Sequence, residues 1–269
     1  MTLPTPIVSA YLSRLRLPDL VGEAPSVEGL TALHQAHVRR VPWETAWIHE
    51  GLDWGIAPTT SAARIATGRR GGYCYHLNGA FSALLTSLGY TVTRHVGGVH
   101  GPDGPAADVM ANHMALVVDL DGAPWYVDVG MGDALWSPVP LAPAALEQEP
   151  FALTLTSVPA DGLGDWHLAH DPRGAFVGMS FFSSPASIDA FAEKHEWLST
   201  SPDSNFVAAR YEPLERTWLV GGGSGHGFKH GPAVAELIAA TLGGGDPLPA
   251  HWALGERVAA QSLRTAGSN

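Results

Sequence analysis

The chain has 269 residues, of which 45% are hydrophobic and 15% charged, and it carries a formal net charge of −11. This composition is typical of a compact globular enzyme and excludes a disordered chain, while the negative charge offers no electrostatic basis for nucleic-acid binding. No secretory signal pattern opens the sequence, and no apolar run is long enough to cross a bilayer. We therefore expect a cytoplasmic protein that binds neither nucleic acid nor a membrane.

The first third of the sequence predicts helices. Apolar residues recur at helical spacing over 7–40, with a break before Ser26, a residue typical of a helix start. A further helix is expected after the Gly71-Gly72 pair, with an apolar face that continues until Gly89 ends it.

From Tyr90 onward the hydrophobic period changes from 3.6 to 2, which predicts strands separated by Gly-, Pro- and Asp-rich turns. The expected strands cover 90–96, 113–118, 125–129, 151–156, 206–211 and 217–220, and further helices are expected over 188–196, 234–242 and 251–261. Helices, then antiparallel strands, then a mixed segment indicate an α+β architecture.

Cys74 is the only cysteine of the chain, so an intrachain disulfide is excluded. It lies in the first turn of the helix expected after Gly72, with Arg69 and Arg70 just upstream. A helix N-terminus and nearby cations both favour the thiolate, which is the nucleophilic form of cysteine. Taken alone, an unpaired cysteine is more often a small buried core residue, so a catalytic role needs further support.

The Asp121-Gly122 pair predicts a two-residue hairpin turn, in which opposed residues have numbers that sum to 243 because Leu120 faces Ala123. In this register His113 and Asp128 are diagonal neighbours on one face, about 7–8 Å apart at the backbone. A carboxylate in such an apolar strand needs a partner, and a histidine on the same face is a suitable one.

Two unrelated polar positions in a different register are the alternative interpretation of this hairpin. Together with Cys74, however, His113 and Asp128 complete a set of nucleophile, base and orienting group.

At these residues the chain resembles the arylamine N-acetyltransferase family. The segment Val41-Pro-Trp-Glu is similar to the family's Val-Pro-Phe-Glu-Asn, and Arg70-Gly-Gly-Tyr-Cys-Tyr-His-Leu-Asn resembles its nucleophile motif. Asn112-His-Met-Ala-Leu-Val and Tyr126-Val-Asp-Val-Gly-Met-Gly resemble its histidine and aspartate motifs, and Ser201-Pro-Asp-Ser-Asn-Phe a later segment. Three motifs in the right order and at suitable spacing make the resemblance specific.

The resemblance implies three domains around a core like that of cysteine proteases and transglutaminases. A helical domain (1–89) carries the nucleophile, and a central antiparallel β-barrel (90–186) carries the histidine and the aspartate. An interdomain helix and an α/β lid domain (187–269) complete the chain.

The resemblance also implies the chemistry, which is ping-pong transfer of an acetyl or other small acyl group from acyl-CoA. Cys74 is the nucleophile that carries the acyl group, His113 is the base, and Asp128 orients His113. The implied acceptor is an arylamine, an arylhydrazine or an N-hydroxyarylamine, as in xenobiotic metabolism. The backbone N–H of Cys74, at a helix start, is a candidate oxyanion donor.

Trp43, Met131 and Phe206 are the implied residues of the acceptor site, and Gly130 and Gly132 are implied contacts of the cofactor. Trp43 replaces the family's usual phenylalanine, and Met131 replaces a common aromatic residue. A flexible methionine admits acceptors of another shape, so these two departures concern the acceptor more than the reaction.

Alternative functions stay open at this point. A biosynthetic amide synthase on the same scaffold would take a polyketide-type acyl chain from an acyl carrier protein, and a non-catalytic relative or a thiol hydrolase is a further alternative. No metal is expected, because histidine pairs such as His226 and His230 lack the flanking pattern of a zinc site. A homodimer is also left open.

Overall fold

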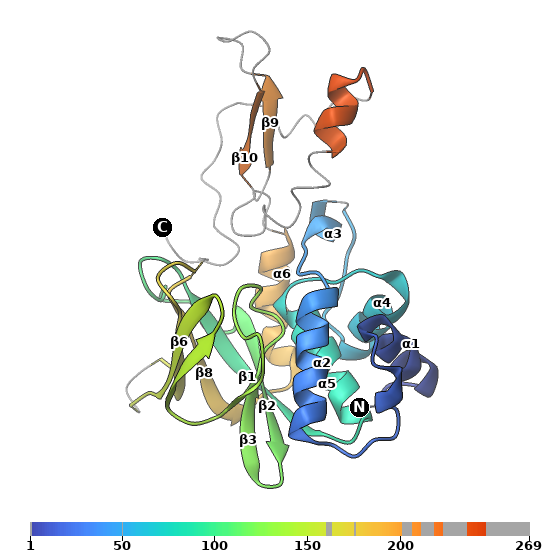
Figure 1. Cartoon of the computed structure of the whole chain (residues 1–269). Helices are drawn as coiled ribbons and strands as arrows, with labels where there is room; N and C mark the ends of the chain where they lie inside the picture. The colour runs from blue at the N-terminus through green and yellow to red at the C-terminus, as the bar shows by residue number, and fades with distance from the viewer. Residues whose placement is uncertain are drawn as a thin grey trace.

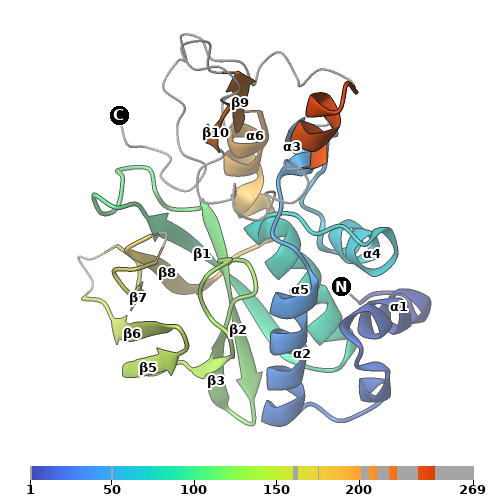
Figure 2. The same cartoon turned by 45° about the horizontal axis from the view of Figure 1, so that its top comes forward.

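The structure, a computed structural model, describes residues 2–49, 51–159, 163–174, 176–200, 206–210, 218–222 and 236–245. Helices from the N-terminal part of the chain pack against one face of an antiparallel sheet (Figure 1). The same arrangement, turned in Figure 2, shows α5 between the outer helices and the first strands of the sheet.

The helices expected over 7–40 and after Gly72 are present, and further helices lie between them. They are α1 (Thr5–Leu15), η1 (Pro18–Leu20), α2 (Val27–Arg40), α3 (Ala46–His49), α4 (Pro58–Gly68) and α5 (Cys74–Ser87). Ser26 caps α2 by accepting a hydrogen bond from Gly29 N at 3.0 Å, which confirms the expected start. Helices α3 and α4 were not predicted; α4 begins at Pro58, a favourable first residue of a helix, and its buried residues are Ser61, Ala62 and Ile65.

Helix α5 is the buried centre of the fold. Its residues from Cys74 to Leu85 are all buried, because α1 and α4 pack on one side of it and β1 and β2 on the other. The helix starts immediately after Tyr73, whose extended backbone takes the N-cap position. Gly89, with a φ of +90°, follows its end as predicted.

Eight strands form one antiparallel sheet, which curls around a second core. They are β1 (Thr91–His100), β2 (His113–Leu120), β3 (Ala123–Val127), β4 (Val139–Pro140), β5 (Ala144–Gln148), β6 (Phe151–Ser157), β7 (Trp166–Ala169) and β8 (Gly178–Pro185). Their order is β4-β3-β2-β1-β8-β7-β6-β5, so β4 and β5 are the edges within the described residues. The sheet is therefore a curled antiparallel half-barrel, which agrees in part with the central antiparallel β-barrel that the resemblance implies.

Strand β2 contributes side chains to two hydrophobic cores. Met114, Leu116 and Val118 pack into the core under the helices, whereas Ala115 packs with Tyr126 in the core enclosed by the curled sheet. Alternate residues of a strand point to opposite faces, so β2 is apolar on both sides. This explains the nearly continuous apolar run that the sequence shows there.

The hairpin register agrees with the sequence-based prediction. Strands β2 and β3 pair Leu120 with Ala123 and Leu116 with Val127, and both sums are 243. Asp121 and Gly122 have φ values of 54° and 80°, the left-handed pair that a two-residue hairpin turn requires.

The C-terminal segment begins with η2 (Ile188–Phe191) and α6 (Ala192–Thr200), which confirm the helix expected over 188–196. Strands β9 (Phe206–Arg210) and β10 (Trp218–Gly222) pair into a separate antiparallel sheet, also as predicted. The helix expected over 234–242 is observed for 236–242, and the one expected over 251–261 lies outside the described residues. Among the helices described, none combines the length and apolarity needed to cross a membrane.

Replacing Gly122 with alanine is expected to destabilise the protein, because a Cβ at φ 80° is strained in the left-handed region. We expect a loss of about 1–2 kcal/mol in the free energy of unfolding by urea. Gly55→Ala is the matched control, since Gly55 has open space around it and an ordinary φ. Equal stability of the two variants would contradict the turn geometry.

Candidate active site

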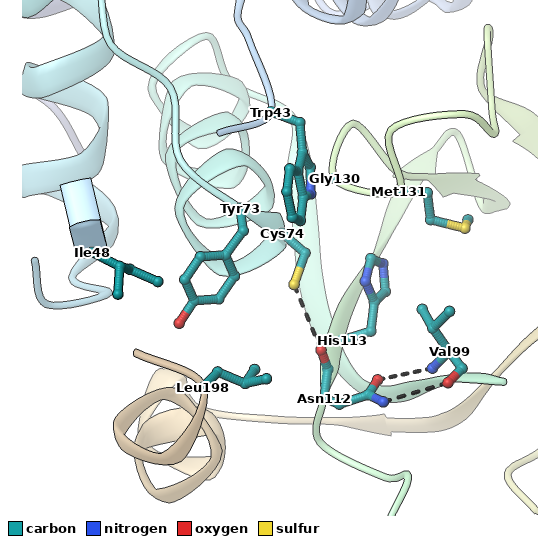
Figure 3. A pocket seen from close by; sticks show the side chains of 10 residues that line it. All are labelled: Trp43, Ile48, Tyr73, Cys74, Val99, Asn112, His113, Gly130, Met131 and Leu198. Atoms are coloured by element: carbon teal, nitrogen blue, oxygen red, sulfur yellow. Dashed lines mark hydrogen bonds between the residues drawn. The ribbon is translucent and has the colours of Figure 1, made fainter. Parts of the chain in front are cut away.

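Cys74 is the first residue of α5, and its side chain faces a pocket between the helices and the sheet (Figure 3). The first N–H groups of a helix have no partner within it, so they place positive potential beside the sulfur. Cys74 is 6% exposed, and its Sγ lies 3.6 Å from the carbonyl oxygen of Asn112, to which it donates. The only thiol of the chain is therefore almost buried and lines the wall of the pocket.

The loop before Cys74 is clamped to the segment that follows α2. Arg70 contacts both carboxylate oxygens of Glu44, at 3.0 Å through Nε and 3.3 Å through a terminal nitrogen. Glu44 N donates to Gly72 O at 2.9 Å. A Cβ at Gly71 would lie 1.7 Å from the Pro42 carbonyl oxygen, so only glycine fits there. These contacts fix where α5 begins.

His113 and Asp128 lie together, as the hairpin register predicts. His113 opens β2 and Asp128 follows the last residue of β3. His113 Nε2 lies 2.6 Å from Asp128 Oδ2, and both side chains are buried. This bond leaves Nδ1 as the ring nitrogen available to Cys74, whose thiol contacts the His113 ring.

The buried carboxylate of Asp128 is fully satisfied by hydrogen bonds. Oδ2 accepts from His113 and from Tyr126 Oη at 3.0 Å, while Oδ1 accepts from Asn78 Nδ2 at 2.8 Å and from Gly130 N at 2.9 Å. A buried carboxylate is tolerated only with such compensation. Asp128 is thus held as an anion in a fixed orientation.

The charge state of the His113–Asp128 pair follows from these contacts. Burial alone would lower the pKa of His113, but the Asp128 charge, its hydrogen bond and the Cys74 thiol outweigh burial and raise the pKa to about 10. Burial alone would raise the pKa of Asp128, but the His113 charge and the hydrogen bonds hold that pKa below its ordinary value. At neutral pH the pair is an imidazolium beside a carboxylate.

A second buried histidine supports Asp128 from α2. His34 Nε2 lies 3.1 Å from the Asp128 carbonyl oxygen, and its Nδ1 lies 3.3 Å from the Trp136 carbonyl oxygen. Burial lowers the pKa of His34 to about 4, so the ring is neutral at physiological pH. His34 therefore joins α2 to the segment that follows β3 without adding a charge near the His113–Asp128 pair.

The sequence-based prediction missed two residues that hold Asp128 in place beside His113. Asn78 bonds Asp128 and also accepts from Val129 N at 2.9 Å, and Tyr126 donates to the same carboxylate. The spacing of both residues in the sequence could have indicated them. Asn78 is four residues after Cys74 on the same helix face, and Tyr126 is two residues before Asp128 on the same strand face.

Trp43 and Met131 line the pocket, as predicted. Their role in binding an acceptor stays a prediction. The pocket is lined by residues of the helices, the strands and α6, namely Trp43, Ile48, Tyr73, Cys74, Val99, Asn112, His113, Gly130, Met131 and Leu198. Phe206 begins β9, and its side chain lies outside the described part of the structure.

The two glycines expected to contact a cofactor lie in different surroundings. A Cβ at Gly130 would lie 2.8 Å from Cys74 Cα and 2.8 Å from Asn78 Nδ2, so Gly130 allows the strand segment to touch the start of α5. Gly132 lines a neighbouring hollow with Arg39, Arg40 and other residues. Contact with a cofactor stays a prediction for both.

Helix α6 is bonded to Tyr73, the residue that precedes Cys74. Tyr73 Oη is hydrogen-bonded to His195 Nδ1 of α6, and Leu198, one helical turn further on, lines the pocket. Burial lowers the pKa of His195, so its ring is neutral and accepts the hydrogen bond of the phenol. The first helix after the sheet thus forms one wall of the site.

Among the residues described, no group of three or more His, Cys, Asp or Glu side chains lies close enough to hold a metal ion. His226 and His230 fall outside the described residues. His95 is engaged elsewhere, with Nε2 2.7 Å from Thr93 Oγ1 and Nδ1 3.0 Å from the Phe182 carbonyl oxygen.

Comparison with known proteins identifies the family. A family model described as N-acetyltransferase matches residues 26–214, which include Cys74, His113 and Asp128. Because this match covers most of the chain, the protein belongs to the N-acetyltransferase family.

Two similar proteins are named arylamine N-acetyltransferases. One from Salmonella typhimurium, also named an N-hydroxyarylamine O-acetyltransferase, is 33% identical over 54% of this chain, and the match spans about half (51%) of that protein. One from Mycolicibacterium smegmatis is 30% identical over 74% of this chain and 73% of that protein. Among solved structures, the Mycobacterium marinum arylamine N-acetyltransferase in complex with CoA is 25% identical, with a TM-score of 0.63 over 72% of each chain.

Gly130→Ala is expected to slow alkylation of Cys74 by iodoacetamide by about 10²-fold, the cost of displacing a reacting group by about 1 Å. The added Cβ pushes against backbone at 2.8 Å, so the start of α5 must move. Gly79→Ala on the same helix is the control, because its Cβ meets atoms only at 3.8 Å. Equal alkylation rates in the two variants would contradict the close approach.

Asp128→Asn is expected to lower the pKa of His113 below its ordinary value, because burial then outweighs every remaining favourable contact. The imidazolium, which persists up to about pH 10 in the wild type, is then lost at neutral pH. We expect alkylation of Cys74 at pH 7 to slow by about 10³-fold or more. The rate of Cys74 alkylation is measured by mass spectrometry as a function of pH. Asp121→Asn, in the exposed turn, is the control. An unchanged pH profile of alkylation in Asp128→Asn would rule out the charged His113–Asp128 pair.

Proposed function

We propose that the protein is an arylamine N-acetyltransferase, which transfers an acetyl group from acetyl-CoA through a thioester on Cys74 to the nitrogen of an aromatic amine. The observation that carries the proposal is the thiol at the start of α5 beside the buried His113–Asp128 ion pair. A thiolate next to an imidazolium is the activated nucleophile of acyl-transfer chemistry.

In the first half-reaction, the Cys74 thiolate attacks the thioester carbonyl carbon and forms a new carbon–sulfur bond. The bond to CoA breaks, and CoA leaves as a thiol after taking a proton from the His113 imidazolium. The backbone N–H of Cys74, at the first residue of α5, is the donor proposed to stabilise the developing oxyanion.

In the second half-reaction, the acceptor nitrogen attacks the carbonyl carbon of acetyl-Cys74. His113, now neutral, takes the proton that the nitrogen loses, and Cys74 leaves as a thiolate. Asp128 keeps the ring in one orientation throughout and stabilises its charged form. The products are the amide and the starting enzyme, so protons and electrons balance over the cycle.

The pocket supports an aromatic and largely apolar acceptor. Its walls are mostly apolar side chains, including Ile48, Met131 and Leu198, and the amide of Asn112 is engaged by the Val99 backbone. Such walls favour a planar ring over a charged or strongly polar acceptor. An arylhydrazine or an N-hydroxyarylamine presents the same kind of planar aromatic ring to these walls. The N-hydroxyarylamine would be acylated on oxygen.

The donor is proposed from two sources. The M. marinum relative was solved in complex with CoA. A CoA thioester also suits a cysteine nucleophile, because attack by the Cys74 thiolate forms one thioester as another breaks, and the acyl group is then held covalently on the protein. The relatives described above give no support to the amide-synthase alternative.

Acetyl-CoA is expected to raise the intact mass of the protein by one acetyl group on Cys74, and an anisidine is expected to discharge it. Cys74→Ser should abolish this gain, because an alcohol has no comparable anionic form at neutral pH. Ser82→Ala, in a buried position further along α5, is the control. Acylation retained in Cys74→Ser, or no acylation of the wild type by any small acyl-CoA, would refute the assignment.

A further inference from the structure

Tyr126 places its hydroxyl group on the carboxylate oxygen that also holds His113. Its Oη donates to Asp128 Oδ2 at 3.0 Å, and His113 Nε2 lies 2.6 Å from the same oxygen. The two other donors to Asp128, from Asn78 and Gly130, both bind Oδ1. Tyr126 is therefore the donor that shares the charge on Oδ2 with His113.

The hydroxyl of Tyr126 is held in a strongly apolar setting. The side chain is fully buried in the core enclosed by the curled sheet, and its ring stacks on Phe181 of β8, with the ring centroids 4.9 Å apart. Burial and the Asp128 charge raise the pKa of Tyr126 well above its ordinary value, so the hydroxyl keeps its proton and stays a donor. A hydrogen bond to a charged group is among the stronger ones, and a low local dielectric strengthens it.

The effect of this hydroxyl on charge is separable from its effect on position. Without it, Asp128 would still accept from Asn78 of α5, from the backbone of Gly130 and from His113 of β2, so both carboxylate oxygens would keep a partner. Each donor to a carboxylate stabilises its negative charge and lowers its affinity for a proton. The Tyr126 hydroxyl thus reduces the charge that Oδ2 presents to the His113 ring.

His113 has opposite tasks in the two half-reactions proposed above. In the first it is an imidazolium that gives its proton to the departing CoA, and in the second it must be neutral to take the proton of the acceptor nitrogen. The Asp128 charge favours the imidazolium, so it supports the first task and opposes the second. A donor that takes part of the charge on Oδ2 reduces this opposition.

We propose that Tyr126 is a positioning residue that acts on His113 through Asp128, weakening the hold of the carboxylate on the imidazolium proton so that His113 can be the base of the second half-reaction. The part that concerns the half-reaction rests on the proposed function. Among the residues described, the titratable groups that face the His113–Asp128 pair are Cys74 from α5, Tyr126 from β3 and His34 from α2. The competing explanation is structural, because a phenol hydroxyl buried in an apolar core needs a hydrogen-bond partner.

The test measures the two half-reactions separately in Tyr126→Phe, which removes the hydroxyl and keeps the ring. At pH 7 we expect transfer from preformed acetyl-Cys74 to an anisidine to slow roughly threefold to tenfold, because less of His113 is neutral, whereas acylation by acetyl-CoA changes by less than about twofold. Tyr11→Phe is the matched control, since Tyr11 is also fully buried and its hydroxyl is hydrogen-bonded to His37 in the core under the helices. An unchanged rate of transfer to the anisidine, or equal slowing of both half-reactions, would overturn the proposal.

A pH titration of His113 separates this inference from the proposed function. In Tyr126→Phe the stronger hold of Asp128 is expected to raise the proton affinity of His113 roughly threefold to tenfold, measured by NMR from the ring nitrogen signals of His113 in the free protein. This titration needs no acylation, so it still tests Tyr126 if acetyl-CoA fails to acylate Cys74. A lower melting temperature of Tyr126→Phe with an unchanged His113 titration would leave only the structural role and refute the proposal.

Discussion

The site depends on keeping an ionised carboxylate in a fully buried position. Asp128 has no exposed surface, and its anion is stable there only because four donors from different elements converge on its two oxygens. Those donors come from α5, β2, β3 and the segment after it. The requirement to satisfy one charge thus fixes the mutual position of the helix that carries Cys74 and the hairpin that carries His113.

The same requirement explains the glycines near the nucleophile. Asn78 reaches Asp128 only because the backbone at Gly130 lies against Cys74, and a side chain there would separate the two. On the other side, Gly71 lets the loop before α5 touch Pro42, so the Arg70–Glu44 pair forms. Close backbone contact on both sides fixes the position of the Cys74 thiol. Because Asp128 holds Nε2 of His113, Nδ1 is the ring nitrogen that can contact this thiol.

The hairpin and the start of α5 were predictable because local chemistry decides them. Asp121 and Gly122 permit one kind of turn, and period-two alternation then puts His113 and Asp128 on one face. The interactions of Asn78 were harder to predict, because they join elements far apart in the sequence. How far the sheet curls was hard to predict for a similar reason, since the distance between the edge strands β4 and β5 depends on curvature that no local pattern specifies.

Strand β2 has a consequence for how the protein loses activity. Because its two faces are packed in two different cores, neither core opens without removing support from His113 at its first residue. Local opening is cheap only where few apolar contacts break, and here both sets would break. The catalytic geometry is therefore part of the cooperative unit of the fold, and amide hydrogens of β2 should exchange only when the whole domain unfolds.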